Sequence, residues 1–216
     1  MTIDTITLQG TLPSVFKGED MHSSDVWLTE LTLRKGARYI ISAESGTGKS
    51  SLCAYIYGAR RDYEGDIFFD TTDIRSLKIH SWQQLRRENL AYLPQELGLF
   101  PELTAWENIE LKNSLTSHFS PLKIETLLSR LGIEARRDFP VGKMSIGQQQ
   151  RVAVIRALCQ PFDFILLDEP VSHLDEANNR LVASIVEEEA EAQGAAIIAT
   201  SVGNHLLLKH AETLHL

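Results

Sequence analysis

The chain has 216 residues, 43% of them apolar and 23% charged, which is enough for one sizeable globular domain. Its formal net charge of −8 argues against an extended surface for nucleic acid. The N-terminal segment has no basic region followed by an apolar core, and no apolar run approaches the roughly 18 residues of a membrane-spanning helix, so we expect neither a signal peptide nor a spanning segment.

Strands and helices are expected to alternate in the first half of the chain. We expect strands at residues 30–33, 37–43, 64–70 and 90–95. A tight turn at Lys35-Gly36 separates the first two strands, and a helix after the second strand ends at Gly58. From 103 to 131 the apolar spacing becomes helical.

The second half continues the alternation. Ser145 is placed to cap a helix, and a buried strand ends at Asp168 and Glu169. We then expect an amphipathic helix closed by Gly194, a core strand at 195–200 and an edge strand near the C-terminus. The acidic run from Val186 to Ala192 is interpreted as a solvated helix face. Together these patterns predict an α/β fold with parallel central strands and an inserted helical middle.

The stretch SAESGTGKSS, residues 42–51, lies between an expected strand and an expected helix. Such an abrupt turn leaves converging backbone N–H groups, which attract phosphate together with the helix dipole, and glycines let the loop wrap the anion. Lys49 would add positive charge near the β- and γ-phosphates, and the Ser50 hydroxyl would ligate Mg²⁺. The usual pattern begins with glycine where this chain has Ala43, so this stretch alone leaves open an ordinary small-residue turn.

Asp168 and Glu169 end the apolar stretch FILLDEP. An acid there can hold the hydration shell of Mg²⁺, and its neighbour can polarise a water for in-line attack on a phosphate. Two acids after an apolar run also occur as a helix cap. Their position downstream of the glycine-rich loop favours the catalytic pairing and indicates that the loop is a phosphate site.

Five ordered motifs resemble the ATP-binding cassette (ABC) ATPases over nearly the whole chain. In that resemblance the Walker A loop is Ala43, Glu44, Ser45, Gly46, Thr47, Gly48, Lys49, Ser50 and Ser51. The other motifs are the Q-loop at Gln95, the signature at Ser145, Ile146, Gly147 and Gln148 after Met144, Walker B at Asp168 and Glu169, and the D-loop at Asp175. Within the family the chain is most similar to the lipoprotein-release, macrolide-export and cell-division ATPases.

The resemblance implies a P-loop NTPase core with a mostly parallel sheet, N-terminal antiparallel strands, and a helical subdomain at about 96–160 within one domain, 1–216. It implies ATP and Mg²⁺ as ligands, the metal held by Ser50, Gln95 and Asp168, and catalytic roles for Glu169, Gln95 and Ser201. Two such domains would pack head to tail around two ATP, with Ser145 meeting the partner's γ-phosphate. The expected partner is an integral membrane subunit, the expected location is the cytoplasmic face of the membrane, and no nucleic acid is expected.

Three departures from the family pattern affect the site. Ile146 replaces a glycine in the signature motif, and Ser201 stands where the family has a histidine that contacts the γ-phosphate. His205 lies four residues later, on an expected helix. These changes predict slow hydrolysis, although the change at 201 is also compatible with a neutral substitution. Phe16 is the candidate for the aromatic that stacks on adenine, whereas Trp27 is expected in the core of the next strand.

Three functions fit these patterns. The first is the ATPase subunit of an ABC transporter-like membrane complex. The second is a soluble ABC ATPase acting on DNA or ribosomes, but the chain lacks sustained coiled-coil heptads and holds a single cassette. The third is a catalytically weak regulatory clamp that binds ATP and dimerises, which Ile146 and Ser201 keep open. Turnover of the purified chain separates the first from the third.

Overall fold

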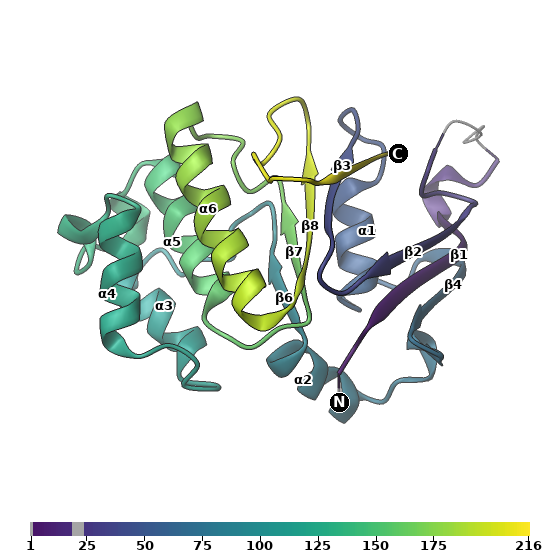
Figure 1. The fold of residues 1–216 in the computed structure, drawn as a ribbon, viewed down its shortest axis with the longest axis horizontal. Helices are drawn as coiled ribbons and strands as arrows, with labels where there is room; N and C mark the ends of the chain where they lie inside the picture. Colours follow the sequence, from purple (N-terminus) through teal and green to yellow (C-terminus); the bar gives the residue numbers. More distant parts are fainter. Residues whose placement is uncertain (1, 19–23) are drawn as a thin grey trace.

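The computed structural model describes residues 2–18 and 24–216, and its strands form two sheets (Figure 1). The antiparallel sheet has the order β2-β1-β4-β5 and comprises β1 (Thr5–Pro13), β2 (Glu30–Arg34), β4 (Tyr63–Phe69) and β5 (Thr72–Asp73). The other sheet is parallel throughout, in the order β6-β7-β8-β3-β9. It comprises β3 (Arg38–Ser42), β6 (Leu90–Leu93), β7 (Phe164–Asp168), β8 (Ala196–Ser201) and β9 (Glu212–His215).

Strand β7, between β6 and β8, is buried along its whole length because both of its faces are covered. Ile165 and Leu167 belong to a core shared with α3 (Ala105–Asn113), α4 (Pro121–Arg130), α5 (Ile146–Leu158) and α6 (Glu176–Gln193). Phe164 and Leu166 belong to a second core, shared with α1 (Lys49–Ile56), α2 (Ile79–Glu88) and the antiparallel sheet. Alternate residues of β7 therefore pack into opposite halves of the molecule. Figure 1 shows the strand between α5 and α6 on one side and α1 on the other.

The predicted α/β fold is confirmed, with one correction to the connection between its early strands. The expected strands at 30–33 and 37–43 do not pair with each other. β2 pairs with β1, with Leu33 opposite Ile6, whereas β3 lies in the parallel sheet between β8 and β9. The turn at Lys35-Gly36 thus leads from one sheet to the other, because the buried stretch Tyr39–Ile41 suits a fully covered strand.

The acidic run on α6 is only partly solvated, so its interpretation as an exposed face was wrong. Glu187 and Glu189 are buried. Glu187 accepts the backbone N–H of Lys209 at 2.7 Å, and Glu189 pairs with Lys123 Nζ of α4 at 2.5 Å. Glu188 stays at the surface and bonds both terminal nitrogens of Arg130 at 2.7 Å.

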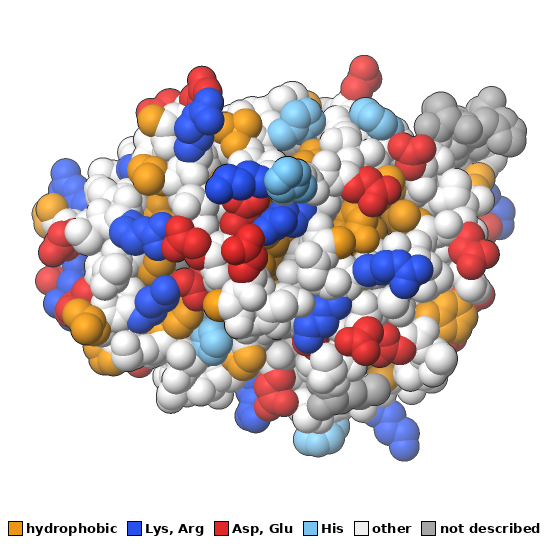
Figure 2. All heavy atoms as spheres, in the orientation of Figure 1, with side chains coloured by type: hydrophobic (Ala, Val, Ile, Leu, Met, Phe, Trp, Pro, Cys, Tyr) orange, Lys and Arg blue, Asp and Glu red, His pale blue; other side chains and the backbone are white. Residues whose placement is uncertain are grey.

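Figure 2 shows basic and acidic side chains interspersed over the face made by α4 and α6, so this face does not carry charge of a single sign. Glu188 and Glu189 of α6 form ion pairs with Arg130 and Lys123 of α4. Within residues 2–18 and 24–216, the helices lack the combination of length and apolarity that would let one of them span a bilayer.

Candidate functional site

The glycine-rich loop joins the end of β3 to the start of α1 at the carboxyl edge of the parallel sheet. Gly48 is the N-cap of α1 and has φ of +99°, a conformation that side chains with a Cβ rarely adopt. A Cβ at this position would lie 3.0 Å from Phe16 and 3.1 Å from Trp27. Trp27 also donates its indole N–H to the carbonyl of Thr47 at 3.1 Å. The aromatic side chains of Phe16 and Trp27, which precede β2 in the chain, therefore pack against the loop at Gly48.

Trp27 is fully buried as expected, but it lies in the turn before β2 and not in a strand. Phe16 ends a short 3-10 helix, Ser14–Phe16, and lies at the edge of the glycine-rich loop. The adenine-stacking role of Phe16 stays a prediction, and its place beside Gly48 is compatible with it.

An open pocket of about 390 Å³ lies over the loop. Its lining residues are Val15, Phe16, Ser45, Gly46, Gly48, Lys49, Ser50, Ser51, Arg60, Gln95 and Glu169. The structure thus brings most of the expected nucleotide residues to one place. Ala43, Glu44 and Thr47 line a neighbouring hollow of about 510 Å³ on the other side of the loop.

Lys49 is the buried cation of this pocket, with 5% of its surface exposed. Its ammonium donates to the carbonyl of Ala43 at 3.2 Å and to the carbonyl of Glu44. Burial lowers the pKa of Lys49, while the negative charges of Glu169 and Asp168 oppose that shift. These carboxylates favour the charged ammonium, the form that attracts phosphate.

The oxygen atoms expected to hold Mg²⁺ fit that metal. Ser50 Oγ donates to Gln95 Oε1 at 3.4 Å, so a hydroxyl and an amide oxygen already lie together. Asp168 is 2% exposed, and its Oδ1 accepts a hydrogen bond from Thr200 Oγ1 at 2.6 Å. Within the described residues its Oδ2 is buried without a hydrogen-bond partner. An all-oxygen set with an unused carboxylate oxygen suits Mg²⁺ or its bound water.

Glu169 follows Asp168 with a backbone φ of +52°, which is uncommon for a residue other than glycine. Its N–H donates to Thr200 Oγ1 at 3.2 Å, and its carbonyl accepts from Gln150 Nε2 at 3.0 Å. The backbone is therefore fixed on both sides while the side chain faces the pocket. Sequence reasoning missed Thr200 and Gln150, because their roles depend on strands and helices that meet only in the fold.

Ser201 ends β8 directly beside the loop, and its carbonyl accepts the N–H of Ala43 at 3.3 Å. Its side chain is buried, and its hydroxyl is hydrogen-bonded to Nδ1 of His205. The expectation that His205 lies on a helix was wrong: residues 205–208 form an irregular segment. The buried amide of Asn179 on α6 donates to the His205 carbonyl at 2.8 Å, which holds that segment out of a helical path.

The signature residues start α5 and do not line the loop pocket. Ser145 Oγ accepts the N–H of Gln148 at 3.3 Å, and Gln148 Oε1 accepts the N–H of Ser145 at 3.1 Å, which forms a capping box. Ile146 is 48% exposed at this helix start. A Cβ on Gly147 would lie 3.2 Å from the His173 carbonyl, so the helix start packs tightly on the segment that follows β7.

Asp175 caps α6 by accepting the N–H of Asn178 at 2.8 Å, and this hydrogen bond lowers the pKa of Asp175. The structure therefore shows a helix-capping role for Asp175, and its place in a D-loop stays a prediction.

Arg60 is a pocket residue that the motif analysis missed. Its guanidinium donates to Ser51 Oγ at 2.9 Å and to Asp62 Oδ1 at 2.9 Å. The tie to Asp62 raises the pKa of Arg60, so the cation is permanent at the rim of the pocket. The signal in the sequence was weak, because Arg60 follows the end of α1 and belongs to none of the motifs.

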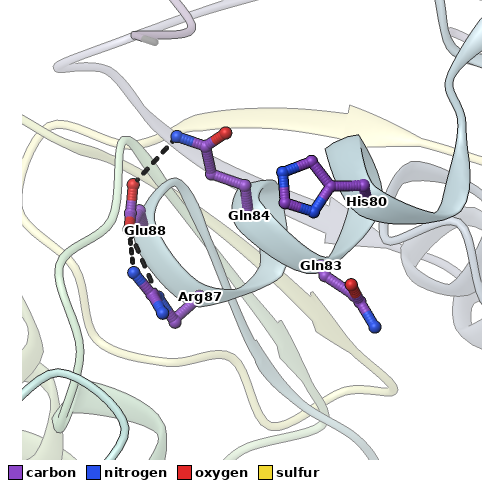
Figure 3. A pocket seen from close by; sticks show the side chains of 5 residues that line it. All are labelled: His80, Gln83, Gln84, Arg87 and Glu88. Carbon is purple, nitrogen blue, oxygen red and sulfur yellow. Dashed lines mark hydrogen bonds and ion pairs between the residues drawn. The ribbon is translucent and has the colours of Figure 1, made fainter.

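A separate hollow of about 490 Å³ lies along α2. Figure 3 shows its side chains, His80, Gln83, Gln84, Arg87 and Glu88, along that helix. Gln84 and Arg87 bond Glu88 instead of pointing toward a common ligand position. The loop pocket, where groups from α1 and from the segments after β6 and β7 converge, is the better candidate site.

The fold and the loop pocket together define a P-loop nucleotide-binding domain. The family described as ABC transporter matches residues 28–172, and the chain belongs to that family. The lipoprotein-releasing system ATP-binding protein LolD of Syntrophotalea carbinolica is 32% identical over 76% of this chain and 74% of its own length.

An uncharacterized ABC transporter ATP-binding protein of Mycobacterium tuberculosis is 33% identical over 79% of this chain, which spans 52% of that relative's length. The chain therefore covers about half of this longer relative. Among solved structures, the dimeric ATP-binding cassette MJ0796 bound to ADP and Pi is 25% identical, with a TM-score of 0.73 over 92% of this chain and 88% of its own.

Proposed function

We propose that this chain is the ATP-binding and ATP-hydrolysing subunit of an ABC transporter-like membrane complex. The observation that carries the proposal is the convergence of Lys49, Ser50, Gln95 and Glu169 in one pocket at the carboxyl edge of the parallel sheet. The relatives named as transporter ATP-binding proteins and the cassette dimer with ADP and Pi support it.

The side chains of the pocket divide the chemistry between them. The Lys49 ammonium would move from the loop carbonyls to the β- and γ-phosphates, and the loop N–H groups would bind the same oxygens. Glu169 would orient the attacking water and accept its proton. Mg²⁺, held by Ser50, Gln95 and Asp168, would neutralise charge on the phosphates. Gln95 would also contact the attacking water.

In the dimer, each ATP-binding site would be completed by residues from a second copy of this chain or from a related cassette. Ser145 and the exposed N-terminus of α5 lie outside the pocket, and we assign them to the partner's γ-phosphate in a head-to-tail dimer. ATP and dimer would then stabilise each other. The membrane subunit would dock near Gln95 and the inserted helices, at about 96–160, on the cytoplasmic face of the membrane.

A weak regulatory clamp is the second candidate, and one observation favours it. Ile146 presents a β-branched side chain, 48% exposed, on the surface that would approach the partner's nucleotide. Steady-state phosphate release by the purified chain separates this candidate from an active ATPase.

Calorimetric titration with MgATP tests the binding step. We expect Lys49→Ala to weaken binding by about 1.5–3 kcal/mol, the scale of a lost charged hydrogen bond. Unchanged affinity would remove the Walker A assignment. Co-purification of the wild-type chain with an integral membrane protein tests the transporter assignment independently.

A further inference from the structure

Gln150 is a buried amide that joins α5 to the segment carrying Glu169. It lies on α5 two residues after Gln148 of the capping box and is 1% exposed. Its Nε2 donates to the Glu169 carbonyl at 3.0 Å and to Ser172 Oγ at 3.3 Å, and its Oε1 accepts the N–H of His173 at 3.2 Å. All of these bonds go to the five residues that follow β7.

The conformation of Glu169 explains why the hydrogen bonds from Gln150 matter. A φ of +52° strains a residue with a Cβ, so the surrounding structure must hold it there. Thr200 Oγ1 accepts the Glu169 N–H, and Gln150 binds its carbonyl. Loss of the Gln150 bond would let the peptide after Glu169 rotate and would move its carboxylate relative to the pocket.

A second contact connects the same two segments. Gly147, in the first turn of α5, packs so closely on the His173 carbonyl that a Cβ there would lie 3.2 Å from it. The start of α5 and the segment from Glu169 to His173 therefore form one packed unit. That unit carries Ser145 at one end and the proposed catalytic carboxylate at the other.

We propose that Gln150 is a positioning residue that fixes Glu169 for hydrolysis and couples it to the signature end of α5. This inference rests on the proposed function. A nucleotide bound by a second copy and contacting Ser145 would change the position or the mobility of α5. The hydrogen bond from Gln150 to the Glu169 carbonyl would then change the position of Glu169 in turn. Lys49 and Ser50 lie on α1, and their hydrogen bonds go to Ala43, Glu44 and Gln95 instead of Gln150.

The test compares Gln150→Met, which keeps the length of the side chain and removes its hydrogen bonds, with the wild-type chain. Gln149→Met is the matched control, because Gln149 bonds the Met144 carbonyl at 3.0 Å and has no hydrogen bond to Glu169. Three quantities are measured: the Kd for MgATP, the kcat for phosphate release, and the dimer fraction with MgATP.

We expect Gln150→Met to keep the Kd and the ATP-dependent dimer while kcat falls roughly 10- to 100-fold, and Gln149→Met to match the wild type. Gln150→Met combined with Glu169→Gln should release phosphate no more slowly than Glu169→Gln alone, because both changes disable the same carboxylate.

Thermal unfolding shows whether Gln150→Met folds. If it does not, Gln150→Asn retains a buried amide but withdraws the donor, and the same loss of kcat at constant Kd is expected. A wild-type kcat in the folded variant would overturn the inference, as would a parallel loss of binding, dimer and turnover. A wild-type chain that neither binds MgATP nor releases phosphate would contradict the proposed function itself.

Discussion

The hydroxyl of Ser201, at the end of β8, is hydrogen-bonded to Nδ1 of His205. An imidazole therefore lies next to position 201, where the family pattern has a histidine. The sequence analysis placed that ring on a helix following the strand. The ring instead lies beside the serine, because two hydrogen bonds hold the loop after β8. Asn179 donates to the His205 carbonyl, and Asn204 donates to the Val171 carbonyl in the segment after β7.

Replacing Ser201 by histidine tests the expectation of slow turnover. Serine is too short to reach a γ-phosphate without a water, and loss of one preorganised donor costs on the order of 10²-fold in rate. We expect slow phosphate release by the wild type and faster release by Ser201→His.

His205→Ala is the matched control for that change. If hydrolysis by the wild type is fast and His205→Ala makes it slow, the His205 ring supplies the missing donor, and the weak-clamp candidate fails. A slow wild type that Ser201→His does not rescue would direct attention to Ile146→Gly.

Gly48 and Gly46 offer a paired test of the loop. Both have positive φ, +99° and +86°, but only Gly48 has side chains behind it. Gly46→Ala should cost about 1–2 kcal/mol of unfolding free energy from backbone strain. Gly48→Ala should cost about 1–3 kcal/mol more, because its methyl group would displace Phe16 and Trp27. Urea unfolding without nucleotide measures both, and equal losses would contradict the packing of the aromatic residues on the loop.

Arg60 should contribute to nucleotide affinity at the pocket rim. Its guanidinium is held by Ser51 and Asp62, so it needs little ordering to meet an anionic ligand. We expect Arg60→Gln to weaken MgATP and MgADP by similar amounts, about 0.5–1.5 kcal/mol. Arg61→Gln is the control, since Arg61 does not line the pocket. Equal affinities for both variants and the wild type would remove Arg60 from the site.

The bond between Arg130 and Glu188 predicts a pH dependence of stability. The guanidinium of Arg130 lowers the pKa of Glu188 from 4.5 to about 2. Because the folded-state pKa is depressed, this stabilisation is complete above pH 4.5 and is lost as the pH falls toward 2. Both side chains are partly exposed, so the contribution is about 0.2–1 kcal/mol.

Glu188→Gln should therefore lower the unfolding free energy at pH 7 and have a smaller effect at pH 3. Chemical denaturation at both values measures the difference. An equal loss at the two pH values would show that the ion pair does not connect α4 to α6 as described.

The sequence was sufficient for features that depend on neighbouring residues. The loop from β3 to α1, the cap at Ser145 and the buried strand that ends at Asp168 were all placed from local pattern alone. Each depends on contacts within a few residues, so spacing and residue type carry the information.

Contacts between distant segments could not be predicted in this way. No strand was expected before residue 30, although β1 forms the middle of the antiparallel sheet. Thr200 and Gln150 looked like ordinary strand and helix residues until the fold brought them to Glu169. The burial of Glu187 and Glu189 depends equally on partners from β3 and α4.

The central claim, that this chain dimerises around ATP and uses Glu169 for hydrolysis, is tested most directly by Glu169→Gln in size-exclusion chromatography with MgATP. The substitution keeps the shape of the side chain and removes its charge. We predict that the variant elutes as an ATP-dependent dimer and releases almost no phosphate, whereas the same variant with Lys49→Ala stays monomeric. A Glu169→Gln variant that stays monomeric with MgATP and hydrolyses it at the wild-type rate would contradict the account.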